Sequence, residues 1–303
     1  MIIARMAESQ MSYSDIQKIE DVISHGYPER YTIVSSSTWQ DDLKDASKLG
    51  IMGNWHFIDN PIIDPSFAGK LPNPTYNVSG YLSSAWKALT DPTTTDPWVW
   101  GFHVRSLIHF IGDVHTPHHN CGLFSAMFPK GDMGGNLYTL NCNWGSCCNN
   151  IHFLWDSVGR VYPLINPTQD ITKKEFEKNV SSIMAEYPEK SFEDVATYNP
   201  KQWSQESFAI ANSIGYGTPK DETPSDDYMT RMRVAGKKRV AAAGYRLYQV
   251  LKTLASSSNI PSSAVKNSPT ITFIWIINVL ALILTVVFGI LYFYPTSEYE
   301  TIM

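Results

Sequence analysis

The sequence predicts an all-α domain followed by one C-terminal transmembrane helix. Helical spacing of apolar residues and terminal signals occur in four segments, residues 12–26, 96–113, 173–187 and 225–254. Of the 303 residues, 43% are hydrophobic and 13% aromatic, which is typical of a globular chain. The 24 residues 271–294 contain no charged side chain.

The elements follow one another within a single domain, which we expect to cover residues 1–258. The last segment is about thirty residues long and carries a long apolar stripe, so we expect it to pack along the body of the domain. Residues 120–150 are rich in Gly, Asn and Cys and predict a long loop, with a small hairpin around 136–144. A loop of this length inside a helical domain is usually functional.

The apolar segment near the C-terminus predicts a membrane anchor. At ~1.5 Å per residue, 24 residues exceed the ~30 Å hydrocarbon core of a bilayer. A buried globular helix is the alternative, but no polar stripe leaves a face for water. We therefore expect a stalk at 259–269, a single-pass helix at 270–294 and a short cytosolic tail at 295–303.

Three further features bear on the side of the membrane that holds the domain. Four clustered cysteines form no CxxC pair, which favours one or two disulfides over free buried thiols: Cys121, Cys142, Cys147 and Cys148. Asn77 and Asn179 begin sequons for N-glycosylation, and residues 299–302 match a sorting motif read in the cytosol. We expect an extracellular or lumenal domain, with a tail-anchored cytosolic domain as the alternative.

The overall charge limits how the chain can bind nucleic acid. The formal net charge is −5, and Lys and Arg form no block. Any contact with nucleic acid must therefore come from bound metal cations or stacking aromatic side chains rather than from a broad basic surface.

Histidine and aspartate side chains of four separate segments predict a metal site. His109 and Asp113, and again His152 and Asp156, are four residues apart, so each pair lies on one face of a helix. One such pair would be a surface ion pair more often than a metal site. Two pairs joined by further His and Asp residues indicate zinc, which binds imidazole nitrogen and carboxylate oxygen. The additional candidates are Asp41, His56 and His119.

Five motifs in a fixed order resemble the single-strand-specific zinc nucleases, the class I family that includes mung bean nuclease. They are WxDxxK at 39–44, HFID at 56–59, HFxGDxHxPxH at 109–119, DxGGN at 132–136 and NxHxxWD at 150–156. The zinc phospholipases C are distant relatives of this family. The resemblance implies an all-α domain that holds three zinc ions in a cleft.

The resemblance also implies a role for each matching residue. The first zinc would be held by Asp41, His56, His109 and Asp113, and the second by His119, His152 and Asp156. Asp113 would also bridge toward the third zinc, and Asp41, Lys44 and Asp113 would be the catalytic residues. Phe57 would stack a nucleobase and Asp59 would bind its edge, with Asn136 also binding substrate, although Phe57 could simply be a core residue. His115 and His118 are expected to be structural or to support the ligands.

Two of the departures from the pattern of the family, besides changes at Gln40 and Thr116, bear directly on the metal site. Relatives begin with Trp-Gly and a nearby His that bind the third zinc, whereas this sequence starts just after that His. We therefore expect two complete zinc sites in this chain, and an upstream segment that carries a signal peptide and the missing ligands. Lys44 stands where relatives carry Arg, which keeps the charge but loses the bidentate phosphate contact.

The function expected from these features is zinc-dependent hydrolysis of single-stranded DNA or RNA and of 3′-nucleotides to 5′-phosphate products. A zinc phospholipase C, acting on the membrane that anchors it, is one alternative. A catalytically impaired surface protein, stabilised by metal but lacking the third zinc, is another. No protein partner follows from the sequence.

Overall fold

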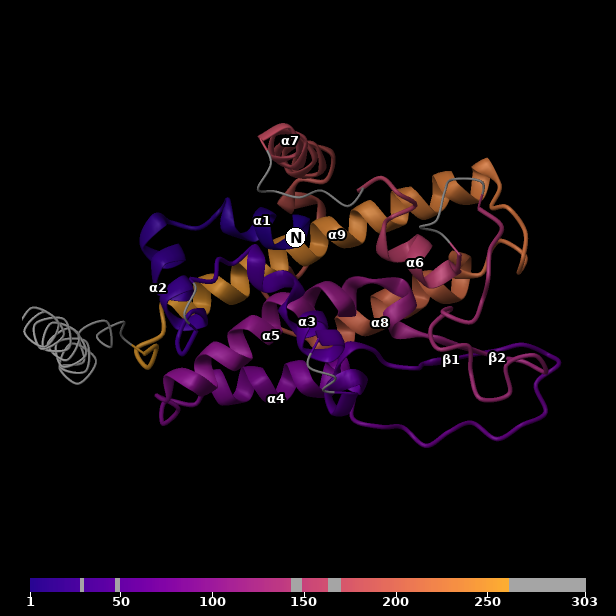
Figure 1. Ribbon diagram of the computed structural model, residues 1–303, viewed down its shortest axis with the longest axis horizontal. Helices are drawn as coiled ribbons and strands as arrows, with labels where there is room; N and C mark the ends of the chain where they lie inside the picture. The colour runs from indigo at the N-terminus through magenta and orange to yellow at the C-terminus, as the bar shows by residue number, and fades with distance from the viewer. Residues whose placement is uncertain (28–29, 47–49, 143–148, 163–169, 262–303) are drawn as a thin grey trace, which may run out of the picture. The chain divides into compact units, whose positions relative to one another are not determined.

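Two long helices, α5 (Pro97–His115) and α9 (Asp226–Ala255), contribute much of the hydrophobic core. Trp100 and Val104 of α5 are fully buried in the same cluster as Leu247 and Leu251 of α9. The computed structural model describes residues 1–27, 30–46, 50–142, 149–162 and 170–261, and Figure 1 shows the shorter helices arranged around this pair. The domain is mainly helical.

The remaining elements are short and surround the two long helices. In chain order the α-helices are α1 (Ile2–Glu8), α2 (Tyr13–Ile23), α3 (Trp39–Ala46), α4 (Val78–Thr90), α6 (Ile151–Asp156), α7 (Asp170–Glu186) and α8 (Pro200–Ile210). The tighter or wider helical turns are η1 (Ser35–Thr38), η2 (Gly50–His56), η3 (Pro117–Asn120), η4 (Glu189–Ser191) and η5 (Ala211–Gly215). Strands β1 (Pro61–Ile63) and β2 (Gly122–Phe124) pair in parallel, with Pro61 opposite Gly122.

The four helical segments predicted from the sequence correspond to α2, α5, α7 and α9. Asp96 caps the N-terminus of helix α5. Its carboxylate accepts hydrogen bonds from the amides of Trp98 and Val99 at 2.8 and 3.1 Å. Pro97 occupies the first turn, where its missing N–H costs nothing. The cap and the proline therefore define where α5 starts.

The predicted hairpin around residues 136–144 is not seen as a pair of strands in the part of the chain that the structure describes. Thr139 and Asn150 instead form an isolated antiparallel bridge. Helices α4 and α8 and the two short strands were not predicted. Of these, α4 begins at Asn77, whose side chain accepts a hydrogen bond from Gly80 N at 3.1 Å.

The first compact unit of the chain runs from Met1 to Pro261. Its last residues are fixed to the domain because Asn259 Nδ2 donates to the carbonyls of Asp91 and Thr94 at 2.8 and 3.0 Å. Within this described part, no helix has the length and apolar character needed to cross a bilayer. The predicted transmembrane segment and tail lie outside the described residues, and anchoring stays a prediction.

The described residues include only some of the cysteines and sequons for which the sequence predicts a modification. Cys121 is a buried free thiol, whereas Cys147 and Cys148 lie outside the described residues, so disulfide formation among the other cysteines stays a prediction. Asn77 caps α4, and the side-chain amide nitrogen of Asn179 is buried on α7. A buried amide is a poor acceptor for a glycan, so Asn77 is the more accessible of the two sequons.

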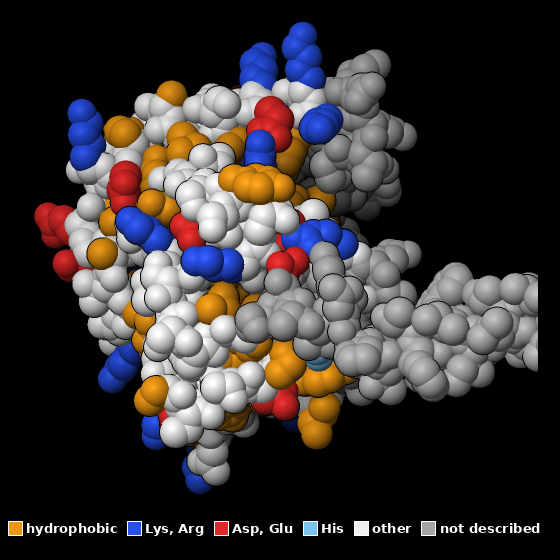
Figure 2. All heavy atoms as spheres, turned by 90° about the vertical axis from the view of Figure 1, so that its left-hand side faces the viewer, with side chains coloured by type: hydrophobic (Ala, Val, Ile, Leu, Met, Phe, Trp, Pro, Cys, Tyr) orange, Lys and Arg blue, Asp and Glu red, His pale blue; other side chains and the backbone are white. Residues whose placement is uncertain are grey.

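The surface agrees with the mixed charge of the sequence. On the face shown in Figure 2, the described Lys and Arg side chains are interspersed with Asp and Glu, and they form no broad basic area there. On this face, nucleic acid would find no extended electrostatic platform.

Candidate metal centre

All eleven residues that the sequence predicts for the site line one cavity of about 980 Å³. They come from segments that are far apart in the chain and that the fold brings together. Helix α3 supplies Asp41 and Lys44, and the end of η2 with the residues after it supplies His56, Phe57 and Asp59. Helix α5 supplies His109 and Asp113, and η3 supplies His119. The loop after β2 supplies Asn136, and α6 supplies His152 and Asp156.

The first ligand group combines side chains of three helical elements. The ligand atoms of Asp41, His56 and His109 all lie within 4.8 Å of one another. Asp113 joins this group, because its Oδ2 is 3.0 Å from His56 Nδ1 and 3.2 Å from His109 Nε2. Two imidazoles and two carboxylates therefore converge on one point.

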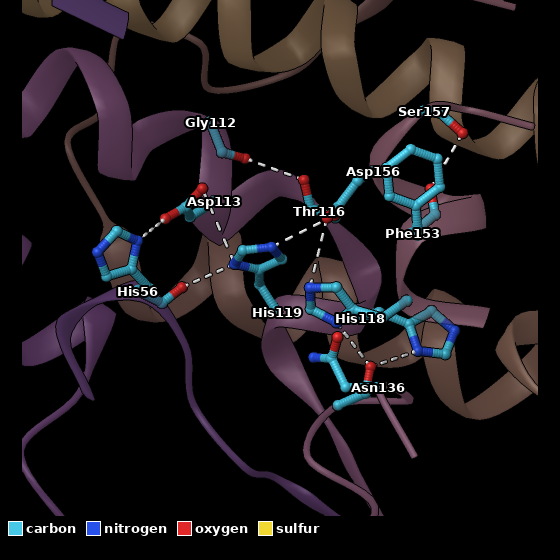
Figure 3. Close-up of polar contacts among 12 residues, drawn as sticks. His56, Gly112, Asp113, Thr116, His118, His119, Asn136, Phe153, Asp156 and Ser157 are labelled. Carbon is cyan, nitrogen blue, oxygen red and sulfur yellow. Dashed lines mark hydrogen bonds and ion pairs between the residues drawn. The ribbon is translucent and has the colours of Figure 1, made fainter. Parts of the chain in front are cut away.

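The second ligand group consists of His119, His152 and Asp156, whose ligand atoms also lie within 4.8 Å of one another. The Asp156 carboxylate is 3.3 Å from His119 Nε2 and 3.4 Å from His152 Nε2. Asp113 lies between the two groups, with its other oxygen, Oδ1, 3.8 Å from His119 Nδ1 (Figure 3).

Backbone carbonyls orient three of the four histidines. The Nδ1 atoms of His109, His119 and His152 lie 2.7, 2.9 and 2.8 Å from the carbonyl oxygens of Ser37, His56 and Gly134. A carbonyl oxygen only accepts, so each Nδ1 carries a proton and donates it. In the neutral imidazole, each Nε2 then has a lone pair directed at the group, which is the usual arrangement around a metal ligand.

The glycines of the DxGGN motif allow this close approach of backbone and histidine. Gly134 has φ +62°, and a Cβ on it would lie 2.5 Å from His118 O. Gly135 has φ +91°, and its Cβ would lie 2.5 Å from Ile151 Cγ2. Both positions therefore require glycine.

The electrostatics of the two groups favour a bound cation. Burial opposes charge on Asp113 and Asp156, yet the neighbouring histidines hold the pKa of both carboxyl groups below the usual value. Against the same burial, Asp113 and Asp156 raise the pKa of His119 to about 10. Ionised carboxylates beside imidazole nitrogens form the donor set that zinc prefers.

Lys44 is held beside the first ligand group. Its Nζ lies 2.8 Å from Asp41 Oδ1, and although burial alone would lower its pKa, the contact with Asp41 raises it. Lys44 is therefore a fixed positive charge at the wall of the cavity.

His115 and His118 lie outside both ligand groups. His115 Nδ1 donates to Ile111 O at 2.7 Å, and its Nε2 accepts a hydrogen bond from Arg246 Nη1 at 2.9 Å. His118 Nδ1 lies 3.0 Å from Gly134 O, and burial lowers its pKa to about 3. Both are neutral buried side chains that support the backbone around the ligands.

A buried ion network beneath the cavity was not predicted. The Glu206 carboxylate of α8 accepts from Arg246 at 2.6 and 2.8 Å and also from Arg239. Arg239 Nε in turn donates to His115 O at 3.3 Å, at the end of the helix that carries Asp113. Arg239 and Arg246 are seven residues apart on α9, a spacing that indicates one helix face, but no sequence pattern indicates their partner.

Comparisons with known proteins agree with this geometry. A model of the S1/P1 nuclease family matches residues 1–256. Endonuclease 1 of Arabidopsis thaliana is 28% identical over 165 residues, which cover 50% of this chain and 49% of that protein. Endonuclease 4 of the same plant is 26% identical over 246 residues (74% and 78%), and Endonuclease 5 is 25% identical over 241 residues (73% and 77%). Because the family match covers most of its length, the chain belongs to the S1/P1 nuclease family.

Proposed function

We propose that the domain is a zinc-dependent phosphodiesterase that hydrolyses single-stranded nucleic acid and 3′-nucleotides and leaves 5′-phosphate products. The observation that carries the proposal is one cavity in which both His/Asp groups lie together with Phe57 and Asp59. Phe57 offers an aromatic face to a base, and Asp59 offers a polar group to its edge. A preference for single strands follows if a base must leave its stack to reach Phe57.

The seven ligands supply two zinc sites with the chemistry that phosphodiester hydrolysis needs. The first site would use Asp41, His56, His109 and Asp113, and the second His119, His152 and Asp156. Bound zinc supplies Lewis acidity toward a phosphoryl oxygen and activates water as the nucleophile. A third zinc, bridged by Asp113, remains an expectation from the resemblance.

The protein side chains position and neutralise the substrate. Lys44 places its ammonium where it offsets negative charge on phosphoryl oxygens, as a point charge rather than a planar guanidinium. Asn136 is exposed at the cavity, and its Nδ2 donates to Met133 O at 2.9 Å, so its amide oxygen remains available to a substrate donor.

The zinc phospholipase C alternative is less well supported by the cavity and by the family. A carboxyl group at Asp59 and an amide at Asn136 suit the edge of a base, whereas an acylglycerol offers no matching donors. A metal-stabilised but catalytically impaired protein would have the same structure. It would differ from an active nuclease only in its turnover of substrate.

The proposal predicts that the purified full-length protein contains at least two zinc ions per chain and cleaves single-stranded DNA. A chelator is expected to abolish cleavage, and added zinc to restore it, because the ligands are side chains already gathered in the fold. Metal analysis and a gel assay of single-stranded against double-stranded DNA provide the measurement. Release of a phosphorylated headgroup from phosphatidylcholine without cleavage of DNA would favour the phospholipase, and zinc binding without either activity the impaired protein.

We also propose that residues 270–294 anchor the protein with its domain on the extracellular or lumenal side and residues 295–303 in the cytosol. The uncharged segment, the clustered cysteines and the sequon at Asn77 support this topology. In sealed vesicles with their cytosolic face outward, the domain is expected to resist added protease and to carry a glycan that endoglycosidase removes. An unglycosylated domain that is degraded without detergent would establish the tail-anchored alternative.

A further inference from the structure

Two acidic side chains lie against neighbouring residues of β2. Asp59 precedes β1, lines the cavity, and places Oδ1 3.4 Å from where a Cβ on Gly122 would be. Asp132, in the loop after β2, is completely buried, and its Oδ1 accepts a hydrogen bond from Leu123 N at 2.9 Å. The strand therefore brings a buried carboxylate close to one that faces the cavity.

Two hydrogen bonds hold the buried member of this pair in place. Asp132 Oδ2 accepts a hydrogen bond from Tyr216 Oη at 2.7 Å, while Oδ1 accepts the amide of Leu123. Burial raises the pKa of Asp132, but these two hydrogen bonds oppose that shift. Because Asp132 accepts two protein donors, we assign the first ionisation of the pair to it and the second to Asp59.

Two other titratable groups beside the pair stay neutral. Cys121, just before β2, and Tyr216, just after η5, both have a pKa raised by burial and by the acidic neighbours. The Asp59 residue as a whole is exposed, but its carboxyl group is partly desolvated by its neighbours. This desolvation and the charge of Asp132 together raise the pKa of Asp59 to about 6.

We propose that the Asp59–Asp132 pair makes the choice of nucleobase depend on pH. This inference rests on the proposed function, in which a base lies beside Phe57 with its edge toward Asp59. An ionised carboxylate only accepts, which suits guanine with its two neighbouring N–H donors. A neutral carboxyl group donates once and accepts once, which suits adenine with its ring nitrogen and amino group.

The direction of the pH effect follows from the protonation of Asp59. Below about pH 6 its carboxyl group is mostly neutral and adenine is favoured, whereas above that pH it is ionised and guanine is favoured. Removing the charge of Asp132 lowers the pKa of Asp59, so that the preference for guanine extends to more acidic solution.

The test compares kcat/KM for 3′-GMP with kcat/KM for 3′-AMP, using the zinc-loaded full-length protein between about pH 5 and about pH 7.5. The ratio cancels the titration of metal ligands and of the phosphate, because both substrates share them. It is expected to rise roughly tenfold across this range, with a midpoint near the pKa of Asp59. A ratio that is constant with pH overturns the inference.

Three variants locate the effect in this pair. Asp132→Asn keeps the shape and an oxygen for Leu123 N, and is expected to move the midpoint measurably to lower pH, because the charge of Asp132 no longer raises the pKa of Asp59. Asp59→Asn, which always donates and accepts, is expected to favour adenine at every pH. Asp64→Asn is the matched control, because Asp64 follows β1 and bonds Ser66 but does not line the cavity; its curve should equal that of the parent protein.

Two results contradict the inference directly. One is an Asp132→Asn curve that superimposes on that of the parent protein, and the other is an Asp59→Asn ratio that still changes with pH. If neither nucleotide is hydrolysed, the proposed function fails, and calorimetric affinities of 5′-GMP and 5′-AMP then test the inference separately. A pH-dependent affinity ratio supports it without turnover, and a constant one overturns it.

Discussion

Replacing Asp113 by Ala is expected to lower the hydrolysis of single-stranded DNA by roughly 10²–10³-fold or more, since electrostatic groups at a reacting centre have effects of this size. Asp113 directs Oδ2 at His56 and His109 and Oδ1 toward His119. A single substitution thus removes a carboxylate from between both ligand groups. It also removes one of the negative charges that favour a bound cation beside the imidazoles.

The measurement is the turnover of a defined single-stranded oligonucleotide together with the zinc content of each protein. Asp113→Asn keeps the size of the side chain and is expected to lose activity too, because the charge is lost. Asp42→Asn is the matched control: this neighbour of Asp41 bonds Thr38 and does not line the cavity. Near-normal cleavage and zinc content in Asp113→Ala would show that Asp113 does not serve the two groups.

The two His/Asp pairs of the candidate ligand groups could be predicted to share a helix face because their spacing is local. His109 and Asp113, and His152 and Asp156, are one helical turn apart, and both segments are helical in the structure. That Asp41 and His56 would join His109 could not come from spacing. The order of the five motifs supplied it through resemblance, and the structure places these side chains in one cavity.

Features that depend on contacts between distant segments were not predictable. Strands β1 and β2 have three residues each, too few for an alternating pattern, and their pairing joins residues about sixty positions apart. The position of Asp132 beside Asp59 depends on that pairing. Helix α8 carries Ser, Gln and Glu among its apolar residues, so its apolar periodicity is weak and the helix was not predicted. Because Glu206 lies on this helix, it was also not predicted as the partner of Arg239 and Arg246.

The Glu206 network is expected to contribute strongly to the free energy of unfolding of the domain. Arg239 and Arg246 are 6% and 3% exposed, and both donate to the Glu206 carboxylate. Burial lowers the pKa of Arg239 to about 10, against the opposing effect of Glu206, so the guanidinium is still charged at neutral pH. Removing the carboxylate would leave two buried positive charges without their counter-charge.

Glu206→Ala is therefore expected to lower the free energy of unfolding by about 3–5 kcal/mol, the usual cost of removing one partner from a buried ion pair. For a domain of this size, that corresponds to a fall in Tm of roughly 10 °C. Calorimetry of the zinc-loaded protein measures the change, with Glu193→Ala as the exposed control. Zinc affinity should also fall, because Arg239 and Arg246 both bond His115, two residues beyond Asp113. A Glu206→Ala protein as stable as the control would mean that water solvates the two arginines or that rearranged side chains balance their charge. Helix α5 would then be held by its apolar packing alone.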